Sequence, residues 1–458
     1  MRKYDAIVIG TGQAGPSLAK RLAASGLNVA VVERKLFGGT CVNTGCTPTK
    51  SLVASAYAAH LVRRAADFGV VAGGRASVDM KQVKDRMRAI VSPSTQGVER
   101  SLRKTEGCAV YQGHARFVSQ REIAIGNETI AADKIFINVG GRALVPDMPG
   151  LDQVDYLTNS SLLATDVLPQ HLVIIGGSYI GLEFAQIYRR FGSEVTVIEM
   201  APRLVPREDE DVSAVVRDIL QREGINIRLN AKCLTVAKHG NGVTANVECQ
   251  EGAPLVVGTH LLLAVGRRPN TDDLGLEKAS IATDEKGFIK VDDQLRTNVE
   301  GIWALGDCNG KGAFTHTAWN DFEIVAANLL DNDTRRVSER IVAYNLYIDP
   351  PLGRVGLTET EVRKSKRPAL IATMAMEDVG RAYERSETLG FMKVFVDQET
   401  KQFIGASILG TGGDEVIHCI LDLMYAKAPY TVMQRAVHIH PTVSEFIPTM
   451  LSELKPLA

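Results

Sequence analysis

Two cysteines stand five positions apart in a run rich in glycine and threonine. The run reads GGTCVNTGCTPTK, and it contains Cys41 and Cys46, followed closely by Lys50. Cysteines at such a spacing can belong to a metal site, a structural disulfide or a redox centre, or they can be unrelated to each other. Sequence patterns elsewhere in the chain distinguish these four interpretations. The first of them are the elements that would position the pair.

The segment just before the cysteines predicts a dinucleotide-binding unit. It reads YDAIVIGTGQAGPSLAKRLAASGLNVAVVER, which indicates a strand, a glycine turn, a helix and a second strand. The glycines are Gly10, Gly12 and Gly15, and Glu33 ends the second strand. Glycines at such a turn let the backbone approach a pyrophosphate at the helix N-terminus, and the acidic residue accepts hydrogen bonds from ribose hydroxyls.

The same pattern occurs a second time in the middle of the chain. The segment HLVIIGGSYIGLEFAQIYRRFGSEVTVIEM has Gly176, Gly177 and Gly181 at its turn and Glu199 at the end of its second strand. In both copies the acidic residue follows the first glycine by 23 positions. One glycine motif alone is weak, but two complete units with equal spacing predict two dinucleotides bound by one chain.

The order of the segments suggests which dinucleotide each unit binds. The cysteine run follows Glu33 almost directly, so the chain returns from the adenosine end of the first site towards the pyrophosphate. We therefore expect FAD in the first unit and a nicotinamide dinucleotide in the second. The carboxylate of Glu199 would bind a ribose 2′-hydroxyl and repel a 2′-phosphate, which favours NAD(H) over NADP(H), although Arg203 lies nearby.

Composition excludes several classes of function. The chain has 458 residues, 45% of them hydrophobic and 23% charged, and its formal net charge is −1. It therefore has no basic surface excess for nucleic acid, and no apolar run approaches the roughly 18 residues of a membrane span. Seven cysteines are too few for a disulfide scaffold of this size, and no secretory signal pattern opens the sequence. We expect a cytoplasmic protein without membrane or nucleic-acid partners.

The remaining segments predict further elements. We expect a helical stretch over roughly residues 52–103, and then a hairpin and a strand in REIAIGNETIAADKIFINVGGR. From about residue 344 onwards, strands such as GFMKVFVD alternate with helical runs such as DEVIHCILDLMYA, which is typical of an α+β domain.

These motifs together resemble the pyridine nucleotide–disulfide oxidoreductase family, which includes dihydrolipoamide dehydrogenase, glutathione reductase and mercuric reductase. The resemblance covers essentially the whole chain. It rests on the two glycine motifs, the C-x₄-C run, Glu183 after the second turn, and the runs AVGRRPN, GIWALGDC and HPTVSE. It implies an α/β fold with two Rossmann-like domains and a C-terminal α+β dimerisation domain. The FAD domain would comprise residues 1–148 and 267–338, the NAD(P) domain 149–266 and the dimerisation domain 339–458.

The resemblance also implies the roles of individual residues. Cys41 would be the thiol that meets the substrate, and Cys46 would lie against the flavin as the charge-transfer thiolate. A thiolate at a helix N-terminus is stabilised by the helix dipole, which suits this role. Lys50 would lie near the flavin and pair with Glu183.

Further cofactor contacts follow from the same resemblance. Asp307 would bind the ribityl chain of FAD, and Thr40 would contribute to the same site. Tyr179 corresponds to a tyrosine that covers the flavin in glutathione reductase and moves when nicotinamide binds, and Gly266 would line the NAD site.

The C-terminal run HIHPTVSE supplies the last expected group. His440 and Glu445 resemble the family's acid–base pair, in which the carboxylate fixes the imidazole tautomer and raises its basicity. In the family this pair enters the active site of the other subunit and the His–Pro bond is cis, so we expect a homodimer. His438 also creates an H-x-H pattern, but no third metal ligand is nearby and we expect no metal site.

The interpretations of the opening run can now be compared. A zinc site would need a second ligand pair, a structural disulfide is rare in the cytoplasm, and the surrounding motifs argue against coincidence. The sequence thus predicts a redox-active Cys41–Cys46 disulfide in an FAD-dependent oxidoreductase that uses NAD(H). We expect a dihydrolipoamide dehydrogenase-like exchange with a dithiol or disulfide. The alternatives are a mercuric reductase-like metal or oxidant-stress reductase and, in another class, a flavin redox sensor without turnover.

Overall fold

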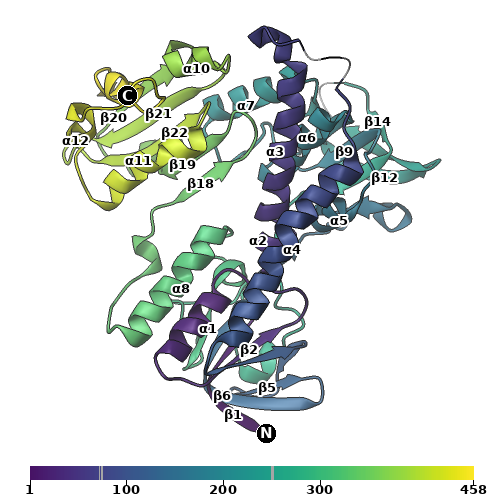
Figure 1. Cartoon of the computed structure of the whole chain (residues 1–458), viewed down its shortest axis with the longest axis vertical. Coiled ribbons are helices and arrows are strands. Elements are labelled where there is room, and N and C mark those ends of the chain that lie inside the picture. Colours follow the sequence, from purple (N-terminus) through teal and green to yellow (C-terminus); the bar gives the residue numbers. More distant parts are fainter. Residues whose placement is uncertain (72, 74–75, 249–251, 458) are drawn as a thin grey trace.

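The computed structural model describes residues 1–71, 73, 76–248 and 252–457. Figure 1 shows three regions: a lower region with the N-terminus, an upper right region with the second glycine unit, and an upper left region with the C-terminus. The long helix α4 (Met80–Lys104) runs from the lower region up to the upper right one, and α3 (Cys46–Arg63) rises from the middle of the molecule beside it.

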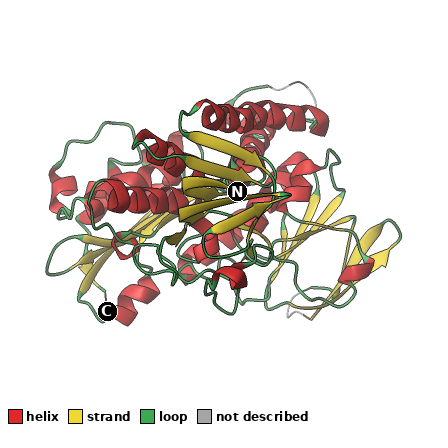
Figure 2. Cartoon of the chain, turned by 90° about the horizontal axis from the view of Figure 1, so that it is seen from below, coloured by secondary structure: helices red, strands yellow, loops and turns green. Residues whose placement is uncertain are grey.

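The lower region is built on a mixed sheet with strand order β3-β2-β1-β6-β5-β4, and β17 pairs with β6 on its other side. The pairs among β3, β2, β1, β6 and β17 are parallel, and their apolar residues, such as Ile7 and Val31, are fully buried. Continuous apolar runs of this kind are typical of parallel strands that are covered on both faces. Figure 2 shows this sheet from below with the N-terminus in front of it. The elements are β1 (Arg2–Ile9), α1 (Gly15–Ala24), β2 (Val29–Glu33), β3 (Cys108–Gln112), β4 (Ala115–Phe117), β5 (Glu122–Ile125), β6 (Glu128–Ile137), β17 (Ile302–Ala304) and α8 (Thr315–Leu330).

The upper right region has a parallel sheet of strand order β11-β10-β9-β15-β8, joined by the antiparallel sheet β12-β13-β14. Its strand–turn–helix–strand unit repeats that of the lower region, as the sequence predicted. The elements are β8 (Tyr156–Leu157), α5 (Asn159–Ala164), β9 (His171–Ile175), α6 (Tyr179–Phe191), β10 (Glu194–Ile198), α7 (Glu210–Arg222), β11 (Asn226–Arg228), β12 (Lys232–His239), β13 (Gly242–Glu248), β14 (Leu255–Gly258) and β15 (His260–Leu263).

The C-terminal region contains an antiparallel sheet of order β18-β19-β22-β21-β20-β23 with helices beside it. Strands β21 and β22 are buried along their whole length, which agrees with the expected α+β domain. The elements are β18 (Ala343–Leu346), β19 (Leu352–Gly356), α9 (Glu359–Ser365), β20 (Ala369–Ala375), α10 (Gly380–Glu384), β21 (Phe391–Asp397), β22 (Phe403–Leu409), α11 (Gly413–Tyr425), α12 (Thr431–Arg435), α13 (Phe446–Leu451) and β23 (Lys455–Pro456).

The helical stretch expected over residues 52–103 was wrong in its extent and its continuity. The structure has a short helix α2 (Gly39–Asn43), then α3 (Cys46–Arg63) and α4 (Met80–Lys104), so the first long helix begins at the second cysteine. Leu52 and Ala56 of α3 belong to the same hydrophobic core as Leu182 of α6 and Leu409 of β22. Helix α3 therefore fixes the cysteine run relative to both the second unit and the C-terminal region.

Short elements complete the chain. A two-stranded ribbon links the lower and upper right regions, and single helical turns occur in the connections. These elements are the ribbon strands β7 (Gly141–Ala143) and β16 (Arg267–Pro269) and the 3₁₀ turns η1 (Ala65–Phe68), η2 (Leu151–Gln153), η3 (Leu276–Ala279), η4 (Gly306–Asn309), η5 (Val337–Glu339) and η6 (Met376–Asp378).

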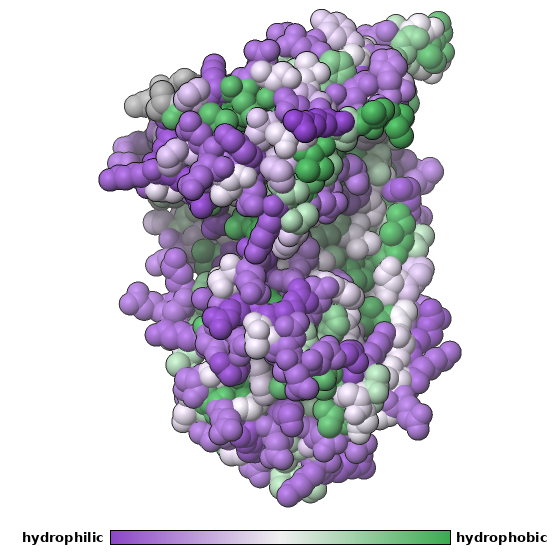
Figure 3. Space-filling view, turned by 90° about the vertical axis from the view of Figure 1, so that its left-hand side faces the viewer, coloured by the Kyte–Doolittle hydropathy of each residue, from purple (hydrophilic) through white to green (hydrophobic). Residues whose placement is uncertain are grey.

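The polarity of the surface and of the helices bears on whether the molecule contacts a membrane. The face in Figure 3 is largely hydrophilic, and hydrophobic side chains gather on it in separate patches. Within the part of the chain that the structure describes, no helix combines the length and the apolar character that crossing a bilayer requires.

Candidate active site

The two cysteines lie at the junction of α2 and α3. Cys41 is within α2, Cys46 is the first residue of α3, and both are free thiols in this structure. Gly45 connects them, and a Cβ at this position would come within 2.8 Å of the carbonyl oxygen of Thr40. The close turn that brings the thiols together therefore requires glycine.

The environment makes the two thiols unequal. The pKa of Cys46 is lowered to about 6, first by a hydrogen bond from Cys41, then by the hydroxyl of Thr315 and the charge of Lys50. Thr315 Oγ1 lies 3.2 Å from Cys46 Sγ. The pKa of Cys41 is raised, first by its hydrogen bond to Cys46 and then by burial. At neutral pH the reduced pair therefore holds a thiolate on Cys46 and a proton on Cys41.

The expected lysine–glutamate pair is present. Lys50 Nζ lies 2.7 Å from Glu183 Oε2, and the Glu183 side chain is only 7% exposed. The other carboxylate oxygen, Oε1, accepts a hydrogen bond from the backbone N–H of Tyr347 at 3.1 Å, and Lys50 Nζ lies 4.5 Å from the centre of the Tyr347 ring. Helix α3, helix α6 and the C-terminal region thus meet at one ion pair beside the thiols.

Polar side chains hold the cysteine run in place. Asn43 donates hydrogen bonds to the carbonyl oxygens of Phe37 and Gly39 at 2.9 and 3.0 Å. Asn159, the first residue of α5, donates to the carbonyl oxygen of Thr44 at 2.8 Å, between the two cysteines. These bonds satisfy the backbone of a loop that would otherwise be free to shift.

The first glycine turn packs directly on the cysteine run. Glu33 Oε2 accepts hydrogen bonds from the backbone N–H of Thr11 at 2.9 Å and from its hydroxyl at 2.6 Å. The N–H of Gly38 donates to the carbonyl oxygen of Thr11 at 3.1 Å, and a Cβ on Gly39 would come within 2.7 Å of Gly12 Cα. The return of the chain towards the glycine turn, which the sequence order predicted, is confirmed.

The same turn has the features of a dinucleotide site. Gly10 has φ of +101°, and a Cβ on Gly10 or Gly15 would collide with backbone oxygens at 2.3 and 2.1 Å. A Cβ on Gly12 would meet nothing closer than 3.4 Å, so packing within the protein does not demand glycine there. The nearest atom is Asn138 Nδ2, a buried donor that has no partner among the described residues. An open face at Gly12 and an unused amide donor beside a helix N-terminus fit a bound pyrophosphate.

Asp307 lies near this turn on the short helix η4. Its carboxylate is 3.6 Å from Arg267 Nε, and burial raises the pKa of Asp307 while the arginine opposes that shift. Arg267 follows Gly266, which has φ of +133°, and the arginine also donates to the carbonyl oxygen of Gly141. Gly266 therefore lies where the chain leaves the second sheet and enters the connecting ribbon.

The second glycine turn has tighter packing within the protein. A Cβ on Gly176 or Gly181 would collide with backbone oxygens at 2.4 and 2.0 Å. A Cβ on Gly177 would also collide, with Leu204 Cδ2 at 2.7 Å. Glu199 follows the last residue of β10 directly, and its Oε2 accepts the backbone N–H of Gly177 at 2.6 Å.

Tyr179 is the first residue of α6 and lies against other aromatic rings. Its ring meets Tyr344 edge-on at 5.6 Å between centroids and Phe314 edge-on at 6.4 Å. Because Thr315 follows Phe314 and contacts Cys46, Tyr179 lies on the side of the second turn that faces the cysteines. Its hydroxyl donates to Glu208 Oε1 at 2.9 Å.

The histidine–glutamate pair forms within the chain but apart from the thiols. His440 Nδ1 lies 3.1 Å from Glu445 Oε1, and the His440 side chain is 81% exposed. The His440–Pro441 bond is cis, as the resemblance implied. No hydrogen bond or ion pair in the described part of one chain joins His440 to Cys41 or Cys46. Among the described residues, no group of three or more histidine, cysteine, aspartate or glutamate side chains is placed to hold a metal ion, at His438 or elsewhere.

Comparison with known proteins decides the family. Residues 4–321 match the family described as pyridine nucleotide-disulphide oxidoreductase, and residues 342–451 match its dimerisation domain. The chain belongs to this family. It is therefore an FAD-dependent oxidoreductase with Rossmann-like domains, and the open first turn and Asn138 fit the flavin dinucleotide.

Individual relatives extend over nearly the whole chain. RclA of Escherichia coli, named a probable pyridine nucleotide-disulfide oxidoreductase, is 36% identical and covers 99% of this chain and 100% of its own. A dihydrolipoyl dehydrogenase of Thermus scotoductus is 34% identical, with coverage of 97% and 96%, and a mercuric reductase of Streptomyces lividans is 32% identical, with coverage of 96% and 94%. The solved structure of a Cu(II) complex of RclA, described as an HOCl-induced flavoprotein disulfide reductase, has a TM-score of 0.90 at 34% identity and covers 99% of both chains.

Sequence reasoning missed three residues of this site. Thr315 was missed because nothing in a 269-residue separation from Cys46 indicates their contact. Asn138 was missed because its contact with Gly12 joins positions that lie far apart in the sequence. Glu208 lies in the acidic run EDED, where its neighbours conceal it.

Proposed function

We propose that the protein transfers electrons between NAD(H) and a small acceptor through the Cys41–Cys46 pair. The observation that carries this proposal is the thiolate at the start of α3, which Cys41, Thr315 and Lys50 stabilise beside two glycine turns. In the reductive direction, NADH and a proton become NAD⁺, and the disulfide takes up the electron pair and becomes two thiols. FAD, when bound, supplies the hydride acceptance and electron-pair transfer that connect these two groups.

We assign the cofactor-binding roles in the same way. Gly10, Gly12, Gly15 and Glu33 form the FAD turn, with Thr40 and Asp307 nearby. The second turn binds the nicotinamide dinucleotide through a second set of residues. This set comprises Gly176, Gly177, Tyr179, Gly181, Glu199 and Gly266. Residues 1–148 and 267–338 form the FAD domain, 149–266 the nicotinamide domain and 339–458 the dimerisation domain.

We assign NAD(H) rather than NADP(H) to the second unit. Glu199 presents a carboxylate at the end of β10, where the adenosine ribose lies in such folds, and a 2′-phosphate there would be repelled. Arg203, the nearby cation, donates to the carbonyl oxygen of Pro206 at 3.2 Å. That bond turns its guanidinium towards its own loop.

The first acceptor that we propose is a dithiol or disulfide. His440 of the partner subunit would first take the proton of Cys41, and the Cys41 thiolate so formed would attack an acceptor disulfide, form a mixed disulfide and release one thiolate, which takes up that proton. Cys46 would then attack Cys41 Sγ, release the second acceptor thiolate and restore the disulfide. His440 of the partner subunit, oriented by Glu445, would take and return the proton of the acceptor thiol. The dihydrolipoyl dehydrogenase relative has this substrate class in its name.

We infer a homodimer from the arrangement of His440. The pair is exposed and lies apart from the thiols of its own chain, and its neighbours Val437 and Ile439 are 100% and 80% exposed. Large apolar side chains at such exposure, in a region that matches a dimerisation domain, are expected to be covered by a second copy.

A second candidate acceptor is Cu(II). The RclA relative has been solved as a Cu(II) complex, and a thiol pair is a soft ligand set that suits copper. Two Cu(II) ions would take one electron each from the dithiol and leave as Cu(I), while the cysteines form a disulfide and release their protons. This reaction needs no base in the partner subunit, so it should not depend on His440.

The test compares acceptors under identical conditions. The purified holoenzyme is assayed with dihydrolipoamide and NAD⁺, with Cu(II) and NADH, and with Hg(II) and NADH. His440→Ala should lower dithiol turnover by roughly 10²–10⁴-fold. The matched control is His438→Ala, which changes an exposed histidine whose Nδ1 lies 3.2 Å from the carbonyl oxygen of Ala436.

The outcomes separate the candidates. Fast dithiol turnover that His440→Ala abolishes supports the disulfide acceptor. Metal-dependent NADH oxidation that is equal in both histidine variants supports the metal acceptor. A flavin that NADH reduces without turnover of any acceptor would contradict both and would favour the redox sensor.

A further inference from the structure

One residue of the C-terminal region touches both members of the ion pair beside the thiols. Tyr347 follows strand β18, and its backbone N–H donates to Glu183 Oε1 at 3.1 Å. Its ring faces the other member of the pair, with Lys50 Nζ 4.5 Å from the ring centre. Tyr347 therefore holds the carboxylate through its backbone and the ammonium through its side chain.

The contact between ring and ammonium has the geometry of a cation–π interaction. An ammonium within about 6 Å of the centre of an aromatic ring is attracted by the negative face of that ring. The Lys50 side chain is 33% exposed and has a flexible four-carbon stem, so a single ion pair leaves other rotamers open to it. The Tyr347 ring adds a second contact, which narrows the positions that the ammonium can take.

The ring of Tyr347 is itself anchored at its hydroxyl end. Asn345 Nδ2 donates to the Tyr347 hydroxyl oxygen at 3.2 Å, and the same amide lies 3.3 Å from the carbonyl oxygen of Asp414 in α11. The backbone bond to Glu183 fixes the other end of the residue. A ring that is fixed at both ends presents one face to the lysine.

Helix α6 holds the chain segment that carries Tyr347. Glu183, Gln186 and Arg190 lie on one face of α6, and none of them is more than 6% exposed. Gln186 donates to the carbonyl oxygen of Asp349 at 2.9 Å and accepts its backbone N–H at 2.7 Å. Arg190 Nη2 lies 2.7 Å from a carboxylate oxygen of Asp349. Together with the bond from Tyr347 to Glu183, these contacts dock the segment on the helix.

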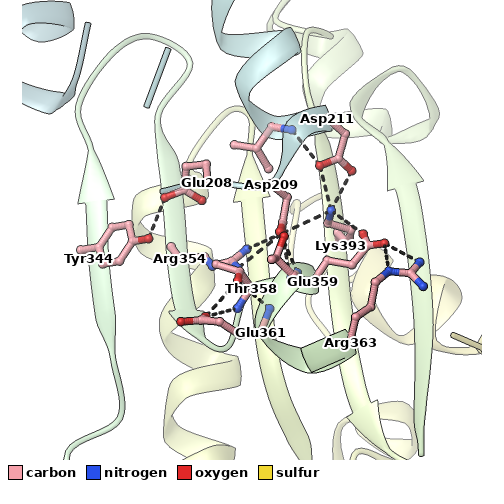
Figure 4. Close-up of polar contacts among 12 residues, drawn as sticks. Glu208, Asp209, Asp211, Tyr344, Arg354, Thr358, Glu359, Glu361, Arg363 and Lys393 are labelled. Carbon is pink, nitrogen blue, oxygen red and sulfur yellow. Dashed lines mark hydrogen bonds and ion pairs between the residues drawn. The ribbon is translucent and has the colours of Figure 1, made fainter. Parts of the chain in front are cut away.

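The two strands on either side of Tyr347 are attached to the second unit as well, as Figure 4 shows. Tyr344 of β18, which precedes Tyr347, donates to Glu208 Oε1 at 2.7 Å. Arg354 of β19, which follows it, is fully buried and lies 3.3 Å from Asp209 Oδ2. Buried ion pairs and hydrogen bonds of this kind are costly to break, so the position of Tyr347 relative to α6 is fixed.

The position of the Lys50 ammonium matters for Cys46. Lys50 lies four residues after Cys46 on α3, so the two side chains share a face of the helix. A hydrogen bond from Cys41 is the main cause of the low pKa of Cys46, the Thr315 hydroxyl and the Lys50 charge add to it, and burial and the Glu183 charge oppose it. A charge that moves away into solvent acts more weakly. If the lysine turned away, the carboxylate would remain and would disfavour the thiolate.

We propose that Tyr347 is a positioning residue whose ring keeps the Lys50 ammonium beside Cys46. The proposal rests on the function proposed above, because it concerns the thiolate of that redox pair. Tyr347 exchanges no proton or electron and acts through the lysine. Ionisation of a thiol in the first unit therefore depends on a side chain that the C-terminal region supplies.

The test follows ionisation of Cys46 in the holoenzyme after its thiols have been reduced with a phosphine. The ultraviolet absorbance of the thiolate is measured against pH as the difference from Cys46→Ser. Tyr347→Leu removes the ring and keeps the backbone N–H that binds Glu183. The midpoint of the titration should rise by about half a unit, because the ammonium is no longer held beside the thiolate.

Three further variants of tyrosine residues control this result. Tyr347→Phe keeps the aromatic face and should restore the wild-type midpoint. Tyr347→trifluorophenylalanine keeps the size of the ring but weakens its negative face, so it should reproduce the shift even if Tyr347→Leu folds poorly. Tyr383→Leu replaces an exposed tyrosine of α10 and should leave the midpoint unchanged.

A double variant separates positioning of the lysine from packing of the ring. Lys50→Met removes the charge and should raise the midpoint by itself. Adding Tyr347→Leu to Lys50→Met should cause no further change, because the ring acts only through the lysine. A second shift in this background would show that the ring acts by packing and would overturn the proposal.

The remaining outcomes are distinct from those of the proposed function. If Tyr347→Leu and the fluorinated variant both titrate as wild type does, the positioning role is wrong, even though NADH reduces the disulfide and acceptors are turned over. If NADH reduces the wild-type flavin without producing new thiols, while both variants shift the midpoint, the proposed function is wrong and the positioning role stands.

Discussion

The two glycine turns share a sequence pattern, but the protein surrounds them differently. In the first, Glu33 is 8% exposed and binds Thr11 through both its N–H and its hydroxyl, and the cysteine run covers the turn at Gly39. In the second, Glu199 is more exposed, and the ring of Tyr179 packs edge-on against Phe314. The first turn is covered at one side by a backbone segment, and the acidic residue of the second turn stays partly exposed.

The difference between the two turns indicates how long each one retains its dinucleotide. A turn covered by a fixed backbone segment suits a dinucleotide that stays bound through many turnovers. A turn whose acidic residue stays partly exposed suits a dinucleotide that enters and leaves in each cycle. We therefore infer that FAD is resident in the first unit and that NAD(H) exchanges in the second.

The largest expected effect on stability comes from replacing the acidic residue at a glycine turn, Glu33 in the first and Glu199 in the second. Glu33→Ala leaves the N–H and hydroxyl of Thr11 and the N–H of Lys35 without their acceptor, which should lower the free energy of unfolding by about 2–4 kcal/mol and release FAD. Glu199→Ala also frees the backbone N–H groups of Gly177 and Ala201, but this residue is more exposed, so water can replace the carboxylate, and the variant should keep its FAD and its melting temperature within a few degrees. Thermal unfolding and flavin content of the two purified variants measure this contrast, and equal losses in both would contradict it.

Glycine substitutions separate packing from cofactor contact. Gly12→Ala meets no protein atom closer than 3.4 Å, so the protein should fold, yet its affinity for FAD should fall by about tenfold or more because the methyl group occupies the pyrophosphate face. Gly177→Ala collides with Leu204 at 2.7 Å and should lower the stability of the second unit instead. Reconstitution of the apoprotein with FAD and urea unfolding distinguish the two. Full FAD affinity in Gly12→Ala would place the pyrophosphate elsewhere.

The preference for NADH over NADPH tests the role of the acidic residue at the second turn. Glu199→Gln removes the negative charge but keeps the shape, so the preference for NADH over NADPH, as a ratio of kcat/KM, should fall by about tenfold. The matched change Glu194→Gln, at the exposed start of β10, should leave the ratio unchanged. A wild-type enzyme that already prefers NADPH would show that Glu199 does not set the specificity.

The smallest expected effect concerns the thiolate of Cys46. The pKa of Cys46 is about 6, so the active thiolate form increases as pH rises through that value. Thr315→Val removes a hydrogen bond that stabilises the thiolate, which raises the pKa and moves the acidic limb of the pH–rate profile upward by about half a unit to one unit. A profile that stays in place would show that the Thr315 contact does not influence Cys46.

Some of this site could be predicted from the sequence and some could not. The glycine turns, the position of the thiols near a helix N-terminus and the pair of Lys50 with Glu183 follow from local patterns and from the family resemblance. The helical stretch was misjudged because its break was overlooked, although Gly69, which has φ of +71° after η1, is a residue type that ends helices. The contacts of Thr315 and Glu208 arise only when three regions meet, and no spacing along the chain encodes that meeting.

The most direct test of the central claim is an anaerobic titration of the oxidised holoenzyme with NADH, with free thiols counted at each step. The account predicts that Cys41 and Cys46 appear as new free thiols together with a long-wavelength charge-transfer absorbance. Cys46→Ser should keep its flavin and lack that absorbance. A wild-type flavin that is reduced by NADH without any new free thiol, or a Cys46→Ser spectrum equal to that of the wild type, would contradict the claim that electrons pass to this cysteine pair.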